Sequence, residues 1–358
     1  MPVVTSIINL KGGVGKTTLT IALAHYLAVE HHRRVLVIDL DPQTNATICL
    51  IPEHDWKARD AMGQTLYGLY RDLLDDSTNF NIGTAIVSSA SNVNGGVFGL
   101  DLLPCSIRLI GVQDDLTRLS RPGVALTAPV TALRDALGPV LGSYDHVLID
   151  CPPALGVVTQ AGLLLSDVFL VPVVPDILSL QGVMPVMDLI ARVARRMNHP
   201  IAPLGTIVSK YHARNRLHAR MLAELRRGSA AGTYPALFGT LIPDLPRIAQ
   251  AADVSARVRT LRQKYGPAHR VLIALTREFL LRAERVSGVK EIAAGQRDMR
   301  RDMQRDGQRT PTTHRLQTPA SASPAPRAAD ESDPRASQPS HPGVSLPKAA
   351  QPSGSSQA

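Results

Sequence analysis

"INLKGGVGKTTLT", residues 8–20, is the stretch that decides the fold of this chain. It follows an apolar, β-branched run, "VVTSIIN", and leads into a helical pattern, "TTLTIALAHYLAVEH". Gly12, Gly13 and Gly15 let the backbone turn tightly, so that successive N–H groups can point at a phosphate. A glycine-rich turn without a ligand is the alternative. Three glycines, two lysines and two threonines within residues 11–18 favour the phosphate-binding loop.

The match to the usual phosphate-loop pattern, G-x-x-x-x-G-K-[ST], is partial, because Leu10 stands where the pattern has its first glycine. In that pattern Lys16 reaches the β- and γ-phosphates, and the hydroxyl of Thr17 binds Mg²⁺. The start of the predicted helix adds the positive end of its dipole. The pattern therefore predicts ATP and Mg²⁺ as ligands, and it assigns no task to the second lysine, Lys11.

Further apolar runs predict a parallel sheet around this loop. "RVLVID", "HVLID", "VFLVPVV" and "LGTIVS" are apolar nearly throughout, which is typical of strands covered on both faces. "LSLQGVMPVMDLIARVARRM" has the pattern of a covering helix. Repeated strand–helix units predict an α/β fold with a doubly wound, mostly parallel sheet and helices on both faces, as in P-loop NTPases.

The composition indicates a soluble protein of a reducing compartment. The chain has 358 residues, 44% hydrophobic and 19% charged, and only three cysteines, which lack metal-site spacing. We expect a cytoplasmic protein with no membrane span, since no apolar run approaches about 20 residues. The net charge of +9 favours a polyanionic partner, although it can also serve solubility alone.

The chain divides into two predicted parts. Residues 1–288 carry the strand–helix alternation, and we expect them to form one ATPase domain. Residues 289–358 are first basic and then, from about Thr310, rich in Pro, Ser and Ala. Such a composition cannot bury enough apolar surface to offset its ordering entropy, so we predict a disordered tail.

Two predicted strands end in aspartate. Asp39 closes "RVLVID" and Asp150 closes "HVLID", and ligands of such sheets bind at the carboxyl ends of the strands. Asp150 suits the Walker B role of holding Mg²⁺. Asp41 follows in the loop before Pro42 and is free to turn toward the γ-phosphate. An isolated aspartate there is ordinarily a helix cap or turn former, but the shared sheet favours the nucleotide.

The segments "KGGVGKTT", "DLDPQTNAT", "LDLLPCS" and "DCPPALG", in this order, resemble the ParA family of DNA-partitioning ATPases within the ParA/MinD group. The similarity covers roughly residues 1–285 and is to the short, Soj-like type, because no helix-turn-helix pattern precedes the loop. The resemblance implies that Lys11 crosses a dimer interface to the partner's phosphates, and that Asp41 positions the attacking water. It also implies that Asp39 supports the magnesium shell and that Thr18 contacts the α-phosphate. The expected ATP contacts are Lys11, Gly12, Gly13, Val14, Gly15, Lys16, Thr17 and Thr18.

The family resemblance further implies a slow ATPase that forms a homodimer on Mg·ATP and binds DNA without sequence preference at the nucleoid. A ParB-type protein would stimulate hydrolysis and thereby release the DNA. The cargo, plasmid or chromosome, is left open. One segment departs from the family pattern, since Asp244 replaces a basic residue.

A basic cluster in the second half is the predicted DNA-binding surface. It contains nine positive charges against Glu224 alone, which suggests phosphate contacts without base reading. A solvated helical face is the alternative. Arg214 falls where the family carries a DNA-binding arginine, and Arg216, Arg220 and Arg247 follow it as candidates. The cluster comprises Arg192, Arg195, Arg196, Lys210, Arg214, Arg216, Arg220, Arg226 and Arg227.

Three other functions use the same fold. A MinD-like protein would bind membrane through an amphipathic helix such as "HRVLIALTREFLLRAERV", although the apolar residues of this helix, from Val271 to Leu280, suit packing on the sheet better. An iron–sulfur reductase would need Cys105 and Cys151 at a subunit interface. A ParA-like ATPase could also position a secretion, flagellar or cellulose-synthesis complex.

Overall fold

The computed structural model describes residues 1–119, 127–245, 248, 253 and 258–286. The chain separates into two units, Met1–Asp302 and Met303–Ala358, and all of the described residues belong to the first. The predicted tail, from residue 289, lies outside the described residues. The predicted domain boundary near residue 288 therefore stays a prediction.

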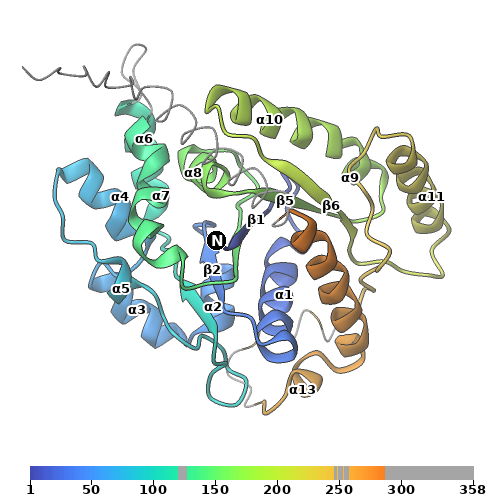
Figure 1. The fold of residues 1–358 in the computed structure, drawn as a ribbon, viewed down its shortest axis with the longest axis horizontal. Coiled ribbons are helices and arrows are strands. Elements are labelled where there is room, and N and C mark those ends of the chain that lie inside the picture. Colours follow the sequence, from blue (N-terminus) through green and yellow to red (C-terminus); the bar gives the residue numbers. More distant parts are fainter. Residues whose placement is uncertain (120–126, 246–247, 249–252, 254–257, 287–358) are drawn as a thin grey trace, which may run out of the picture. The chain divides into compact units, whose positions relative to one another are not determined.

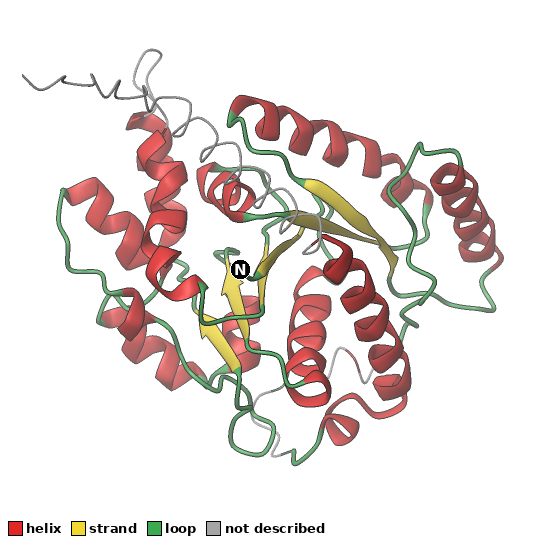
Figure 2. Ribbon diagram, in the orientation of Figure 1, coloured by secondary structure: helices red, strands yellow, loops and turns green. Residues whose placement is uncertain are grey.

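The centre of the fold is a six-stranded sheet with the order β3-β2-β4-β1-β5-β6. All pairings between these strands are parallel, as predicted (Figure 2). Its central position makes β1 a neighbour of both β4 and β5, so the chain winds outward in both directions from the first strand. The strands are β1 Val3–Ile7, β2 Val35–Asp39, β3 Leu100–Leu103, β4 His146–Asp150, β5 Val168–Val173 and β6 Ala202–Val208.

Helices cover both faces of the sheet (Figure 1). The chain is also helical over residues 269–286, the last that the structure describes. The helices that precede this segment include α1 Lys16–His31, α2 Asn45–Leu50, α3 Glu53–Ala61, α4 Leu66–Asp75, α5 Ile82–Ala85, α6 Leu109–Leu119, α7 Thr127–Leu141, α8 Val157–Leu165, α9 Ile177–Gln181, α10 Val183–Arg196, α11 Arg216–Ala230 and α13 Leu261–Tyr265, with a 3₁₀ turn at Gly266–Ala268.

The strand period of two divides the buried residues into two cores. On β2, Val35 and Val37 belong to the core under α1 and residues 269–286, whereas Leu36 and Ile38 belong to the core under α4, α6, α7, α8 and α10. Alternate side chains point to opposite faces of a strand, so an all-apolar strand supplies both layers. This explains why the predicted strands lack polar alternation.

The register brings the carboxyl ends of three strands to one level. Both β1 and β2 pair with β4, with Ile7 and Asp39 each opposite Asp150. The loop after β1 therefore lies beside the two aspartates that the sequence singled out. A one-residue slip would turn these carboxylates to the other face of the sheet.

Two apolar helices bear on the membrane question. The helix over residues 269–286 packs Leu272, Leu275, Phe279 and Leu280 into the core that it shares with α1. Its Val271 is half-buried. In the described part of the chain, one helix, Ile177–Arg196, is long and apolar enough to cross a membrane by length and composition. The core helices of soluble proteins can have the same length and composition, and four valine and isoleucine side chains of this helix are buried in the core under α4, α6, α7, α8 and α10.

Candidate functional site

The loop between β1 and α1 has the conformation that its glycines predict. Gly13 and Gly15 have φ values of 73° and 88°, in the left-handed region that favours glycine. Gly15 is the N-cap of α1, and as a glycine it has no side chain that could cap the amides of the first turn. These amides are thus free for an anion at the positive end of the helix dipole.

Neighbouring strands hold this loop in place. Ser209, directly after β6, donates its hydroxyl to the carbonyl of the buried Val14 over 2.7 Å. Asn9 donates its side-chain amide to the Pro172 carbonyl at 2.8 Å and accepts the Lys11 N–H at 2.9 Å. The loop is therefore preorganised by contacts with β5 and β6, and the anchors Asn9 and Ser209 were not foreseen from the sequence.

Lys16 lies inside the loop. Its side chain is almost fully buried, and Nζ donates to the Lys11 carbonyl at 3.3 Å. Burial lowers the pKa of Lys16, and the charges of Asp150 and Asp41 oppose that effect. Because this hydrogen bond is long, the Lys16 ammonium group can exchange it for a stronger one to a charged acceptor, such as a phosphate oxygen.

Thr17 and Asp150 meet beneath the loop. The Thr17 hydroxyl donates to Asp150 Oδ2 over 2.6 Å, and Thr20 lies 3.4 Å from the other carboxylate oxygen. Burial, followed by the charge of Asp39, raises the pKa of Asp150 well above its ordinary range. Hydroxyl and carboxylate oxygens are the ligands that Mg²⁺ prefers, and the ionised form of a buried carboxylate is favoured by a cation bound beside it.

Asp39 is fully buried and already hydrogen-bonded on both oxygens. It accepts the N–H of Asp41 at 3.1 Å, and the N–H and hydroxyl of Thr47 at 2.8 and 2.7 Å. Thr47 in turn accepts the N–H of Cys105, which follows β3. Burial raises the pKa of Asp39. These contacts make Asp39 a support for the Asp41 loop. Thr47 ends the quoted segment "DLDPQTNAT", but no role was predicted for it from the sequence.

Asp41 lines the same hollow as the loop. This hollow has a volume of about 380 Å³ and is bordered by Gly12, Gly13, Gly15, Lys16, Thr17, Thr18 and Asp41. One Asp41 oxygen accepts the Gln43 N–H at 3.0 Å. Pro243, Asp244 and Leu245 also line the hollow, so the departure at Asp244 borders the candidate nucleotide site.

Lys11 turns away from its own loop. Its ammonium group donates to both carboxylate oxygens of Asp176, at 2.9 and 3.0 Å, and to the Ser179 hydroxyl at 2.9 Å. Asp176 also caps α9 by accepting the Ser179 N–H. Although burial alone would raise it, the hydrogen bonds from Lys11 and Ser179 lower the pKa of Asp176. Asp176 lies 165 residues from Lys11, so no local pattern indicates the pair.

Lys210 of the predicted basic cluster lines the hollow beside the loop, whereas Arg214, Arg216 and Arg220 do not belong to its lining. Arg214 is exposed between β6 and α11, and Arg216 and Arg220 are exposed on α11. Arg227 pairs with Glu224, whereas no ion pair joins these first three arginines to an acid among the described residues. Arg247 lies outside the described residues.

The cysteines proposed for an iron–sulfur cluster are internal. Cys105 and Cys151 are both free and both fully buried in the second core. A cluster shared by two subunits would need their sulfur atoms at the surface. Their positions therefore suit side chains that fill the core.

A phosphate cradle at the carboxyl edge of a parallel sheet, with a buried lysine, a threonine and paired aspartates, defines the class of P-loop nucleotide-binding proteins. The model of a family described as "AAA domain" matches residues 3–202. The chromosome partitioning protein ParA of Caulobacter vibrioides is 34% identical over 69% of this chain and 83% of its own length. Soj of Bacillus subtilis, a sporulation initiation inhibitor protein, is 30% identical over 69% and 87%.

Among solved structures, cobyrinic acid a,c-diamide synthase from Mycobacterium smegmatis, with a bound ATP analog and magnesium, superposes with a TM-score of 0.55. It is 30% identical, and the match covers 69% of this chain and 88% of the synthase. The chain belongs to the ParA family of P-loop ATPases.

Proposed function

We propose that this chain is a DNA-partitioning ATPase. It binds Mg·ATP in the hollow lined by residues 12–18, forms a homodimer around two nucleotides, and binds DNA without sequence preference as the dimer. Hydrolysis, slow in the isolated protein, dissolves the dimer and releases the DNA. The names of its ParA and Soj relatives support partition over the positioning of another complex.

The observation that carries this proposal is the different placement of the two lysines. Lys16 is buried within its own loop, whereas Lys11 leaves the loop and is held by Asp176 at the edge of the site. In phosphoryl transfer, positioned positive charge is the main source of acceleration. A lysine outside its own site can supply that charge to a second subunit, which makes the active site conditional on dimerisation.

The residues beneath the loop suit a magnesium ion. Thr17 and Asp150 offer adjacent hard oxygen ligands, and Asp39 adds a second buried negative charge behind them. Bound with ATP, Mg²⁺ would neutralise charge on the phosphates. Asp39 would act through its hydrogen bonds to Asp41 and Thr47, which fix the carboxyl end of β2.

Asp41 is the candidate for orienting the attacking water. Its carboxylate lies in the hollow, and one oxygen is held by the Gln43 N–H. The second oxygen is available to accept a hydrogen bond from water in line with the γ-phosphate. Backbone amides of the loop and of Thr17 and Thr18 would bind the phosphates from the opposite side.

The rim of the site suits an interface between two subunits. Ile177 and Leu178 follow Asp176 directly and are 48% and 71% exposed. Ile107 and Ile110, beyond the carboxyl end of β3, are 58% and 55% exposed. Isolated exposed apolar residues are ordinary, but four of them at the edge of the sheet that holds the nucleotide site favour burial against a second copy.

The proposed cycle of ATP binding and hydrolysis requires a partner protein that triggers hydrolysis. A ParB-type protein bound at a partition site would stimulate hydrolysis, so the cargo would follow a retreating boundary of DNA-bound ATPase. Exposed arginines on α11 and the loop before it supply the phosphate contacts. The expected location is the nucleoid in the cytoplasm.

The deciding experiment measures binding to random-sequence duplex DNA with ADP, ATP and a non-hydrolysable ATP analogue. We expect strong binding with ATP and the analogue, and weak binding with ADP. Lys16→Ala should abolish both nucleotide and DNA binding, because it removes the charge inside the cradle. Lys57→Ala, an exposed lysine paired with Glu53, is the matched control. DNA binding that is equal in all nucleotide states would contradict the proposed cycle.

A further inference from the structure

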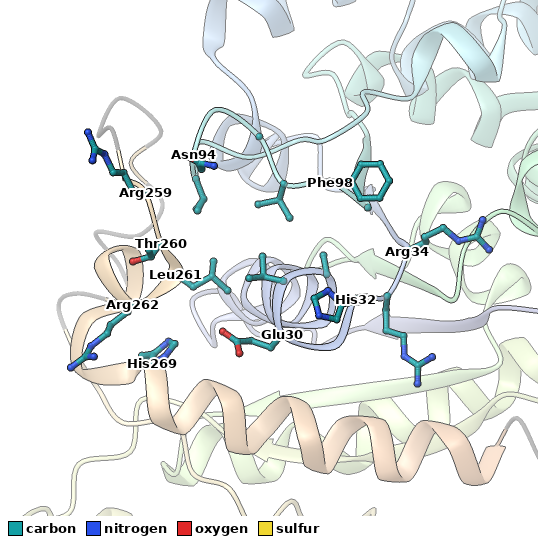
Figure 3. Close-up of a pocket in the computed structure, with 17 residues that line it drawn as sticks. Glu30, His32, Arg34, Asn94, Phe98, Arg259, Thr260, Leu261, Arg262 and His269 are labelled. Atoms are coloured by element: carbon teal, nitrogen blue, oxygen red, sulfur yellow. The ribbon is translucent and has the colours of Figure 1, made fainter.

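A second hollow lies at the opposite edge of the sheet from the nucleotide site. It has a volume of about 580 Å³ and lies where β2 and β3 begin, whereas the phosphate loop lies where the strands end. Its walls are the end of α1, the segment 93–99 before β3, and residues 259–262 at the start of α13 (Figure 3). Neither the motifs nor the proposed ATPase cycle gives this hollow a task.

Backbone hydrogen bonds fix the walls to one another. The Val35 N–H donates to the Gly99 carbonyl at 2.7 Å, and the Asn94 N–H donates to the Val258 carbonyl at 2.8 Å. Val93 and Val258 form a parallel bridge. Gly99 has a φ of 82°, and a Cβ there would lie 3.3 Å from the Arg33 carbonyl oxygen. The hollow is therefore preformed rather than opened by a ligand.

The floor of the hollow is apolar and its rim is cationic. Leu261 points toward the middle of the hollow in Figure 3. Arg259 and Arg262 lie at one end, and Arg34 lies beyond the other. Arg33 has Glu284 at 3.7 Å, while Arg34, Arg259 and Arg262 have no ion pair among the described residues. The apolar lining consists of Ala28, Val29, Val93, Val97, Phe98 and Leu261.

The residues that line the hollow carry a net positive charge. Glu30 is the acidic residue of the lining, against four arginines. His269 is engaged through Nδ1 with the Tyr26 hydroxyl at 2.8 Å, and His32 ends α1. Beyond Arg262, a neighbouring hollow is bordered by Arg270. A ligand with negative charge is therefore favoured at both ends of the hollow.

Phe98 adds an aromatic anchor beside this charge. Its side chain is 91% exposed, on a segment whose backbone is held at both ends by the contacts of Val93 and Gly99. Exposed aromatic side chains next to arginines are typical of the centres of binding interfaces. A rigid segment presenting Phe98 loses little entropy when a partner covers it.

The arrangement excludes a compact anion as the natural ligand. The guanidinium groups of Arg259, Arg262 and Arg34 diverge from the hollow in Figure 3, whereas a phosphate needs donors that converge. Duplex DNA would contact the arginines but would leave the apolar floor unfilled. An extended peptide can fill the floor with an apolar side chain and reach arginines at both ends with acidic ones.

We infer that this hollow is a docking site for an acidic peptide segment of a partner protein, with an apolar anchor between its acidic residues. The anchor lies over Leu261 and against Phe98, and the acidic residues pair with Arg259 and Arg262 on one side and with Arg34 on the other. Because the site is at the far edge of the sheet, it works in either nucleotide state. The inference does not depend on the proposed ATPase cycle.

The test uses the full chain and a fluorescein-labelled peptide in which Leu-Leu-Phe is flanked on both sides by Asp and Glu. Two control peptides replace the acids by Asn and Gln, or the apolar centre by Ser. Binding is followed by fluorescence anisotropy without nucleotide. We expect the first peptide to bind and each control peptide to bind at least about tenfold more weakly.

Protein variants locate the contact. Arg259→Gln combined with Arg262→Gln should weaken peptide binding by about tenfold, as expected for two exposed charge pairs, and Phe98→Ala should weaken it several-fold. The matched control combines Arg71→Gln and Arg134→Gln, two exposed arginines on α4 and α7, and should leave binding unchanged. ATP hydrolysis should be the same in all of these variants.

Three results would overturn the inference. One is that the acidic peptide does not bind. Another is that the Arg259/Arg262 and Arg71/Arg134 variants lose the same affinity, which would indicate general charge attraction. The third is that inorganic phosphate or a short DNA duplex displaces the peptide from the unaltered protein with equal potency to unlabelled peptide, which would make the surface a general anion or DNA site.

Discussion

We predict that the contact between Lys11 and Asp176 weakens dimerisation of the chain. If Lys11 must leave Asp176 before it reaches the phosphates of a partner subunit, the contact stabilises the monomer. Asp176→Asn removes the negative charge while keeping a residue that caps α9 well, because Asn and Asp are similarly good N-caps. The variant therefore separates the ion pair from the start of the helix.

The magnitude follows from the exposure of the pair. The side chains of Lys11 and Asp176 are 38% and 29% exposed, so the pair contributes up to about 1 kcal/mol. A dimer breaks two such pairs, and about 2 kcal/mol corresponds to roughly a 30-fold change in the association constant. Asp176→Asn should thus tighten the ATP-dependent dimer by up to about 30-fold.

The assay is sedimentation equilibrium with a non-hydrolysable ATP analogue across a range of protein concentrations. Asp75→Asn is the matched control, because Asp75 forms an exposed pair with Arg71 away from the site. In a Lys11→Ala background the gain from Asp176→Asn should vanish, since the coupling belongs to the pair. A dimer that is weaker or unchanged in Asp176→Asn alone would refute the reasoning and make Asp176 part of the interface itself.

Three further predictions address hydrolysis, DNA binding and stability. Asp41→Asn should allow ATP-dependent dimerisation but slow phosphate release by about 10²-fold or more, and a normal rate would reduce Asp41 to a turn residue. Arg214→Gln should flatten the log–log salt dependence of DNA affinity by about one unit with dimerisation intact, whereas Arg134→Gln should not. Burial, followed by the charge of Lys264, lowers the pKa of His25 to about 3. Below pH 6.5 His25 is therefore protonated in the unfolded chain but stays neutral in the folded chain. Because the unfolded state binds more protons, the free energy of unfolding should fall as pH falls from 6.5 toward 5. Urea titrations at several pH values should show a shallower fall in His25→Gln, and an equal slope would count against this role.

The sequence by itself predicted the sheet and the phosphate-binding loop at its carboxyl edge. The glycine loop, Lys16, Thr17 and the aspartates at the ends of β2 and β4 occur in local patterns, and parallel strands bring their carboxyl ends to one edge. Five of the six strands were predicted because each is an apolar run. The strand β3 was not, since it has only four residues and includes Asp101. Its place at the edge of the sheet depends on pairing with β2.

Contacts between distant segments were decided by tertiary structure alone. The partner of Lys11 is Asp176, and the hydroxyl that anchors the phosphate loop at the Val14 carbonyl comes from Ser209. The hollow beside Phe98 is assembled from segments that lie far apart along the chain. A local pattern records which side chain a strand or helix presents. Which residues that side chain contacts depends on strand register, on the course of the loops and on packing. These are fixed only when the helices pack on both faces of the sheet.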